Sequence, residues 1–64
     1  MKTFDSLLNE AASEMKRVKS YYPFRIVWCA VHPVTLEFSG VYATPTKAKL
    51  NRYLREGYNC YVTE

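Results

Sequence analysis

The run from residue 24 to residue 31, Phe-Arg-Ile-Val-Trp-Cys-Ala-Val, constrains the fold of this 64-residue chain most strongly, because seven of its eight residues are apolar. Alternate side chains of a β-strand point to opposite faces of its sheet, so Trp28 and Cys29 would lie on different faces. A strand that is apolar on both faces needs cover on both. The run therefore predicts a central strand, with a helix on one face and another helix, a second copy or a different molecule on the other.

Four further elements are predicted from local patterns. Apolar residues recur every three or four positions after Thr3, which predicts an amphipathic helix with that threonine as its N-cap. Apolar and polar residues alternate in two other segments, which predicts an edge strand with one solvated face and a third strand. Thr44 and Pro45 are typical of a helix start, and Gly57 is typical of a helix end. The predicted elements are helices over 4–20 and 45–56 and strands over 24–31, 34–41 and 58–63.

The register of the predicted hairpin depends on the number of residues in the turn that begins at His32-Pro33. A difference of one residue moves every side chain of a strand to the other face. Either the Trp28 face or the Cys29 face of the first strand would therefore join Leu36 and Phe38 in the core. The larger volume of Trp28 and its face neighbours favours the first alternative, because a small core needs its large residues.

These elements predict one small α+β domain over residues 1–64, in the order helix, strand, strand, helix, strand. A right-handed crossover through the second helix would place the third strand beside the first. The expected sheet is antiparallel with three strands in the order second, first, third. We expect both helices to cover one face of this sheet. The other face would then be covered by a target or by a second copy in a homodimer.

The cysteines and the N-terminus bear on compartment and cofactors. Cys29 and Cys60 lie in apolar strand-like runs and are too few for a disulfide framework, so reduced and buried thiols are expected. A zinc site that added His32 would lack a fourth ligand, so we expect neither a metal nor a cofactor. Polar residues interrupt the N-terminal segment, which predicts no signal peptide and no membrane span. We expect a cytoplasmic protein.

Positive charge is concentrated in the segment that contains the second predicted helix. Residues 42–57 carry Lys47, Lys49, Arg52 and Arg55 against Glu56, a net charge of +3 that equals the net charge of the whole chain. Helix stability does not explain two lysines near the start of a helix, where cations oppose the macrodipole. Either a solvated basic face or a binding surface for acidic protein or phosphate accounts for the stripe. Candidate partner-binding residues are Lys47, Lys49, Arg52 and Arg55, with Trp28 and Tyr61 as aromatic contacts.

The sequence has little that could support catalysis. Its one histidine, His32, adjoins a proline in a predicted turn, its carboxylates are scattered, and it has two glycines. We therefore expect no enzyme but a binding protein. One class is a protein-binding module, such as an inhibitor of a larger acidic protein or complex. The alternative is a nucleic-acid-binding accessory protein that uses the basic second helix.

The segment from Phe24 to Glu64 combines a hairpin, a helix that starts at Thr44-Pro45 and a strand that follows Gly57-Tyr58. This layout covers about two thirds of the chain. It resembles the layout of small bacteriophage and mobile-element proteins that disable host machinery, including transcription inhibitors and anti-defence proteins such as anti-CRISPRs. The resemblance rests on layout and carries no residue roles. It implies a short non-enzymatic chain that binds a host protein or complex stoichiometrically and blocks it, in the host cytoplasm if a phage encodes the chain.

Overall fold

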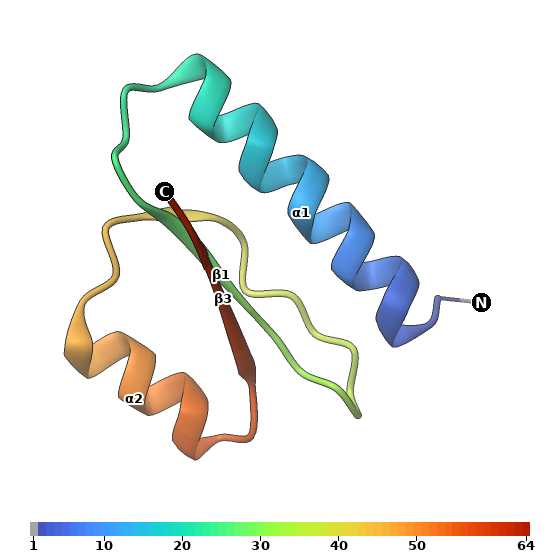
Figure 1. Ribbon diagram of the computed structural model, residues 1–64. Coiled ribbons are helices and arrows are strands. Elements are labelled where there is room, and N and C mark those ends of the chain that lie inside the picture. The colour runs from blue at the N-terminus through green and yellow to red at the C-terminus, as the bar shows by residue number, and fades with distance from the viewer. Residues whose placement is uncertain (1) are drawn as a thin grey trace.

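The computed structural model describes residues 2–64 and forms two helices and a three-stranded antiparallel sheet (Figure 1). The strand order is β2-β1-β3, with β1 in the centre. The predicted α+β class, element order and strand order are therefore confirmed. The elements are α1 (Phe4–Tyr21), β1 (Val27–Val31), β2 (Tyr42–Ala43), α2 (Lys47–Arg55) and β3 (Asn59–Thr63).

The two helices lie on opposite sides of the sheet, which corrects the expectation that they share one face (Figure 1). On one side, Leu7, Ala11 and Met15 of α1 pack against the face of β1 that carries Cys29. On the other side, the ring of Trp28 meets Tyr53 of α2. All five residues of β1 are consequently buried within one chain. The apolar face that was expected to need a second copy or a target is covered by α2.

The hairpin register also differs from the favoured alternative. Leu36, Phe38 and Val41 pack on the α1 side of the sheet, together with the Cys29 face of β1. Trp28 instead pairs with Tyr42 in β2 and lies on the α2 side. The volume argument is wrong because it assumed a single core. The fold has two packing layers, and the large Trp28 ring belongs to the second.

The predicted second strand over 34–41 is reduced to one bridge, between Val31 and Phe38, followed by the two-residue β2. Two residues lie between Trp28 and Val31, whereas three lie between their partners Phe38 and Tyr42, so the second side holds one extra residue. This two-against-one arrangement is that of a β-bulge, and Gly40 adopts a φ of 88° within it. Alternation alone does not reveal an inserted residue, and this explains the error.

The residues predicted to start α1 and to follow α2 have the expected roles, and α1 ends at Tyr21, one residue beyond the predicted end. Thr3 caps α1, where its Oγ1 accepts a hydrogen bond from the Ser6 amide at 3.2 Å. Gly57 has the left-handed φ of 95° expected after α2. The start of α2 is wrong by two residues, because Thr44 has a φ of 55° and the extended N-cap residue is Thr46.

The first strand begins at Val27 rather than at residue 24, as β1 has the shorter bounds. Phe24 and Arg25 are exposed and precede it. Neither helix among residues 2–64 has an apolar stretch that is long enough to cross a membrane.

Candidate functional site

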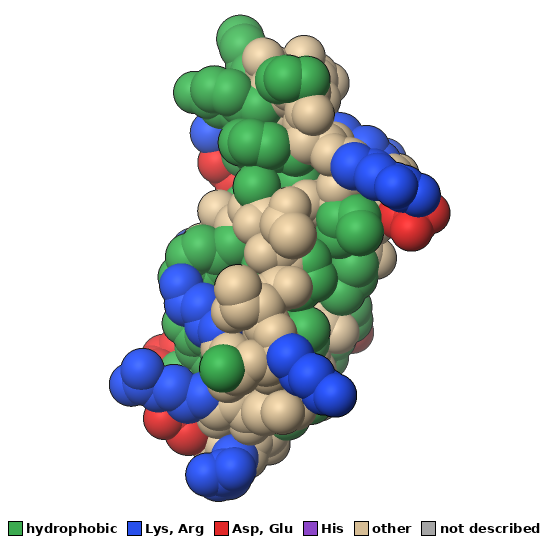
Figure 2. Space-filling model, turned by 90° about the vertical axis from the view of Figure 1, so that its left-hand side faces the viewer, with side chains coloured by type: hydrophobic (Ala, Val, Ile, Leu, Met, Phe, Trp, Pro, Cys, Tyr) green, Lys and Arg blue, Asp and Glu red, His purple; other side chains and the backbone are tan. Residues whose placement is uncertain are grey.

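The basic residues of α2 form one exposed surface. Lys47, Lys49, Arg52 and Arg55 are all exposed, and together we call them the α2 basic surface. Figure 2 shows Lys and Arg side chains gathered over α2 in the lower half of this face. The carboxylate of Glu56 lies 3.7 Å from Arg52 Nε, which partly neutralises this one guanidinium. The structure therefore brings together all four basic residues that the sequence singled out.

A row of aromatic side chains holds α2 against the sheet. The ring of Tyr53 lies 6.0 Å from Trp28 and 5.0 Å from Tyr58, both in edge-to-face geometry. Trp28 continues the row to Tyr42 at 5.0 Å, and Tyr58 continues it to His32 at 5.0 Å. Pairs of this kind contribute about 0.5–1.5 kcal/mol each beyond the burial of their surface. We call these five residues the aromatic row, and they fix the position of the α2 basic surface.

Trp28 lies inside the molecule, so it is not available to a partner. Its side chain is 1% exposed, and its buried indole Nε1 has no hydrogen-bond partner within residues 2–64. The expectation that Trp28 contacts a partner is therefore corrected. Trp28 positions α2 from below, through Tyr53.

Lys49 contacts an aromatic ring of the sheet, and this contact helps to explain why a lysine stands near the start of α2. Its Nζ lies 3.9 Å from the centroid of the Tyr42 ring, which is a close cation–π arrangement. The Tyr42 hydroxyl donates a hydrogen bond to the Ser39 carbonyl at 2.6 Å, so the ring itself is held in place. Lys47 has no comparable contact in the structure of residues 2–64, and the first turn of α2 carries no acidic residue.

Two shallow hollows adjoin the α2 basic surface. One, of about 240 Å³, lies between α2 and Tyr58 and is lined by Lys49, Arg52, Tyr53, Glu56 and Tyr58. The Tyr58 hydroxyl donates to the Glu37 carboxylate, and this hydrogen bond raises the pKa of Tyr58 to about 12. The second hollow shares Arg52 and Glu56 with the first. Arg52 is therefore the basic residue that a molecule seated in either hollow would meet.

Tyr61 is on the other side of the sheet from the α2 basic surface. It pairs with Cys29 and is half-buried on the α1 side. There it lines an apolar groove of about 190 Å³ between α1 and β3. The six residues predicted to contact a partner thus divide into the exposed basic surface, the buried Trp28 and the separate groove at Tyr61. The lining residues of the groove are Leu8, Ala11, Ala12, Met15, Lys16, Cys29, Tyr61 and Thr63.

An exposed aromatic cluster between α1 and β1 was missed from the sequence. Tyr21, Tyr22 and Phe24 are all exposed, and the Tyr22 and Phe24 rings stack with centroids 5.4 Å apart. Hydrophobic side chains gather at the upper end of the face in Figure 2, away from α2. The signal that could have revealed the cluster is Pro23, because it ends the helix and lies between the aromatic residues.

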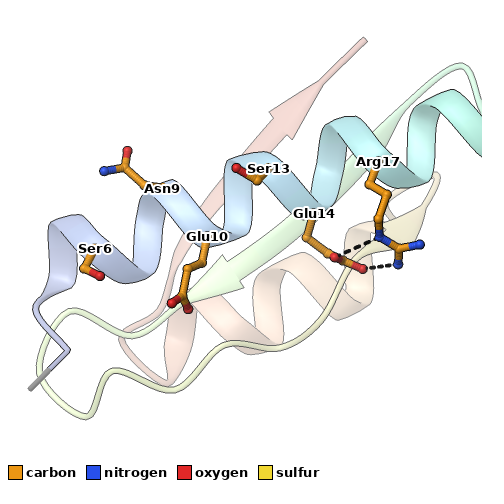
Figure 3. A pocket seen from close by; sticks show the side chains of 6 residues that line it. All are labelled: Ser6, Asn9, Glu10, Ser13, Glu14 and Arg17. Atoms are coloured by element: carbon orange, nitrogen blue, oxygen red, sulfur yellow. Dashed lines mark hydrogen bonds and ion pairs between the residues drawn. The ribbon is translucent and has the colours of Figure 1, made fainter.

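The polar face of α1 carries a wide, open depression, shown in Figure 3. Glu14 and Arg17 form a two-pronged ion pair there, with Arg17 Nε 3.1 Å from the carboxylate. The hydrogen bond from Arg17 lowers the pKa of Glu14. Both side chains are exposed, so they form an ordinary solvated ion pair on the helix surface. The six lining residues are Ser6, Asn9, Glu10, Ser13, Glu14 and Arg17.

His32 and the two cysteines are the side chains most suited to catalysis or metal binding, and each is placed within the packing of the fold. His32 Nδ1 accepts hydrogen bonds from the Val34 and Thr35 amides, both at 3.1 Å, and so shapes the turn. Cys29 is buried against Met15, and burial raises the pKa of its thiol to about 11. Cys60 is also unpaired, and it projects from the opposite face of the sheet. Residues 2–64 contain no group of three metal-ligating side chains.

Comparisons of the chain with protein-family models, with curated proteins and with solved structures find no match. The resemblance to bacteriophage inhibitors therefore stays a prediction. Function is inferred from the surface of the molecule.

Proposed function

We propose that this protein is a non-enzymatic binding protein that attaches to an acidic surface of a larger protein or complex and blocks it stoichiometrically. The observation that carries the proposal is the α2 basic surface, with four exposed cations on one anchored helix against the single carboxylate of Glu56. A set of like charges on one surface attracts an opposite surface and speeds association. The expected location of this activity is the cytoplasm of a host cell.

The charge placement at the start of α2 supports a binding role over a purely solvated face. Cations in the first turn of a helix oppose the macrodipole, at a cost of about 0.3–1 kcal/mol each. Lys49 recovers part of this cost through the Tyr42 ring, whereas Lys47 has no such contact among residues 2–64. Lys47 is therefore the residue whose position helix stability explains least.

The exposed aromatic cluster supplies a second anchor for the same partner. Tyrosine and arginine are enriched among the residues that dominate binding energy at protein interfaces. Tyr21, Tyr22 and Phe24 remain uncovered within the chain, although they are large and partly apolar. A partner that covers them would remove this surface from water.

Charge reversal tests the proposal. The variant Lys47→Glu, Arg52→Glu, Arg55→Glu and the control Lys2→Glu, Lys16→Glu, Lys19→Glu change the net charge equally. We expect only the first to weaken binding to a partner isolated from host lysate, by about tenfold or more, because reversing three charges turns attraction into repulsion. Titration calorimetry should give one fixed stoichiometry with the wild type. Equal weakening by both variants would show that net charge alone matters, and would contradict the proposal.

Binding to single-stranded nucleic acid is the second candidate function, and the stacked pair of Tyr22 and Phe24 favours it. Exposed rings stack on bases while basic side chains contact phosphates. If four cations contact phosphates, the logarithm of the affinity should fall with the logarithm of salt concentration with a slope of about −3. Fluorescence anisotropy with a labelled oligonucleotide measures this slope. Loss of the lysate partner after nuclease treatment would favour this candidate over a protein partner.

A further inference from the structure

Within residues 2–64, the outer edge of β3 has free backbone hydrogen-bonding groups. The Ser39 amide donates to the Ala30 carbonyl at 2.9 Å, and the Ala30 amide donates to Ser39 Oγ at 2.8 Å. Both backbone groups of Ala30 therefore face the β2 side of the sheet. Because these groups alternate in direction along a strand, those of Cys29 face β3 and meet its partner Tyr61.

The same alternation continues along β3. The backbone groups of Tyr61 point to β1, so those of its neighbours Cys60 and Val62 point away from the sheet. An edge strand with open N–H and C=O groups is a template for another strand, and proteins commonly protect such edges with charges, prolines or bulges. β3, with the sequence Asn-Cys-Tyr-Val-Thr, has no charged residue and no proline. Its edge is therefore unprotected.

Both sides of this edge are apolar. On the α2 side, the Val62 side chain is 54% exposed. On the α1 side, the edge borders the groove lined by Tyr61, with Leu8 and Met15 among its walls and the Lys16 side chain at its margin. A strand that pairs with β3 must therefore present apolar or aromatic side chains on both of its faces.

We propose that β3 pairs with β3 of a second copy, antiparallel about a two-fold axis at Tyr61, and so forms a continuous six-stranded sheet. In this register the open backbone groups of Cys60 meet those of Val62 in the other copy, and the reverse pair is identical by symmetry. The side chain of Val62 then covers Cys60 of the other copy.

The strand that pairs with this edge is β3 of a second copy, because β3 itself presents the apolar and aromatic side chains that such a strand must have. Its open residues, Cys60 and Val62, are placed symmetrically about Tyr61, and every facing pair within the strand is uncharged. The two Tyr61 rings meet on the groove side, where Lys16 offers a cation to the incoming ring. A five-residue strand pair buries little surface, so the dimer should be weak and should depend on concentration.

Sedimentation equilibrium over a wide range of protein concentration tests the inference on the purified chain. We expect the wild type to pass from monomer to dimer as concentration rises. Val62→Lys should raise the dimer dissociation constant about tenfold or more, because it places a charge at the paired edge of each copy. The matched control is Val34→Lys, which changes an 82% exposed valine at the turn after His32. This control should dimerise as the wild type does.

Amide hydrogen exchange locates the interface independently. The amides of Cys60 and Val62 should exchange more slowly as the protein is concentrated, whereas the amide of Tyr61 is bonded within the monomer and should change little. The inference is overturned if the wild type stays monomeric at all concentrations, if Val62→Lys dimerises as well as Val34→Lys, or if the Cys60 and Val62 amides show no concentration dependence. Because no other protein is present, these outcomes are separate from binding through α2.

Discussion

Replacing Tyr53 by alanine tests whether the aromatic row holds α2 on the sheet. Tyr53 makes two edge-to-face pairs, with Trp28 and with Tyr58. At about 0.5–1.5 kcal/mol each, the two pairs contribute about 1–3 kcal/mol. Burial of the half-exposed ring adds roughly 1 kcal/mol, so the expected loss of unfolding free energy is about 2–4 kcal/mol. A domain of this length is stabilised by only about 3–10 kcal/mol in total, so the loss should be large in proportion.

The assay uses Trp28, the only tryptophan of the chain, as a probe of α2 docking. Urea unfolding followed by circular dichroism gives the free energy, and tryptophan emission reports whether Trp28 stays buried. We expect Tyr53→Ala to shift the emission to longer wavelength, because α2 covers the indole through this contact. Tyr21→Ala is the control, since that side chain is 74% exposed, and it should cost less than about 0.5 kcal/mol. A loss of similar size in both variants, with unchanged emission, would refute the role assigned to the row.

Three further predictions concern the structure of the isolated chain. The pKa of Tyr58 is raised to about 12 from an ordinary 10, so folding favours the neutral form of this side chain. The resulting contribution to the free energy of unfolding is present below pH 10 and is lost as the pH rises to 12. Tyr58→Phe should flatten that part of a pH–stability curve. Cys60 should react with a thiol reagent under native conditions much faster than the buried Cys29. In Cys60→Ser only the slow phase of this reaction should remain. A fast phase in that variant would contradict the burial of Cys29. Gly57→Ala should cost more than about 1 kcal/mol in urea unfolding, because φ is 95° and the new Cβ would lie 3.2 Å from His32 Nε2, whereas a neutral effect would show that the turn relaxes freely.

The sequence predicts those parts of the fold that local patterns encode. The periodicity that starts at Phe4 marks the packed face of α1 as far as Val18, and the continuous apolar run marks the central position of β1 correctly. Local patterns do not encode the side of the sheet on which a helix packs. The contact between Trp28 and Tyr53 sets that side, and the two residues lie far apart in the chain. The sequence pattern around each of them is compatible with either face of the sheet.

The candidate site also has one part that the sequence predicts and one part that it does not. The α2 basic surface is predictable because exposed charges opposite an apolar arc follow from helix geometry alone. The burial of Trp28 and the exposure of Phe24 were not predictable, because both are aromatic residues of one apolar run. Pairing begins only at Val27, where the main chain meets both neighbouring strands, and this tertiary fact decides which aromatic residue is covered.

The two faces of the sheet hold their helices by different means, and this affects how α2 would bind. On one face α1 buries Leu7, Ala11 and Met15 in an aliphatic core. On the other, no residue of α2 is buried, and the helix depends on ring contacts made chiefly through Tyr53. The proposed binding surface therefore lies on the less deeply buried of the two helices, which should open more readily than α1. A partner that binds only the docked form of α2 would shift this opening equilibrium toward the docked state, so amide exchange in Lys47–Arg55 should slow on binding more than exchange in α1.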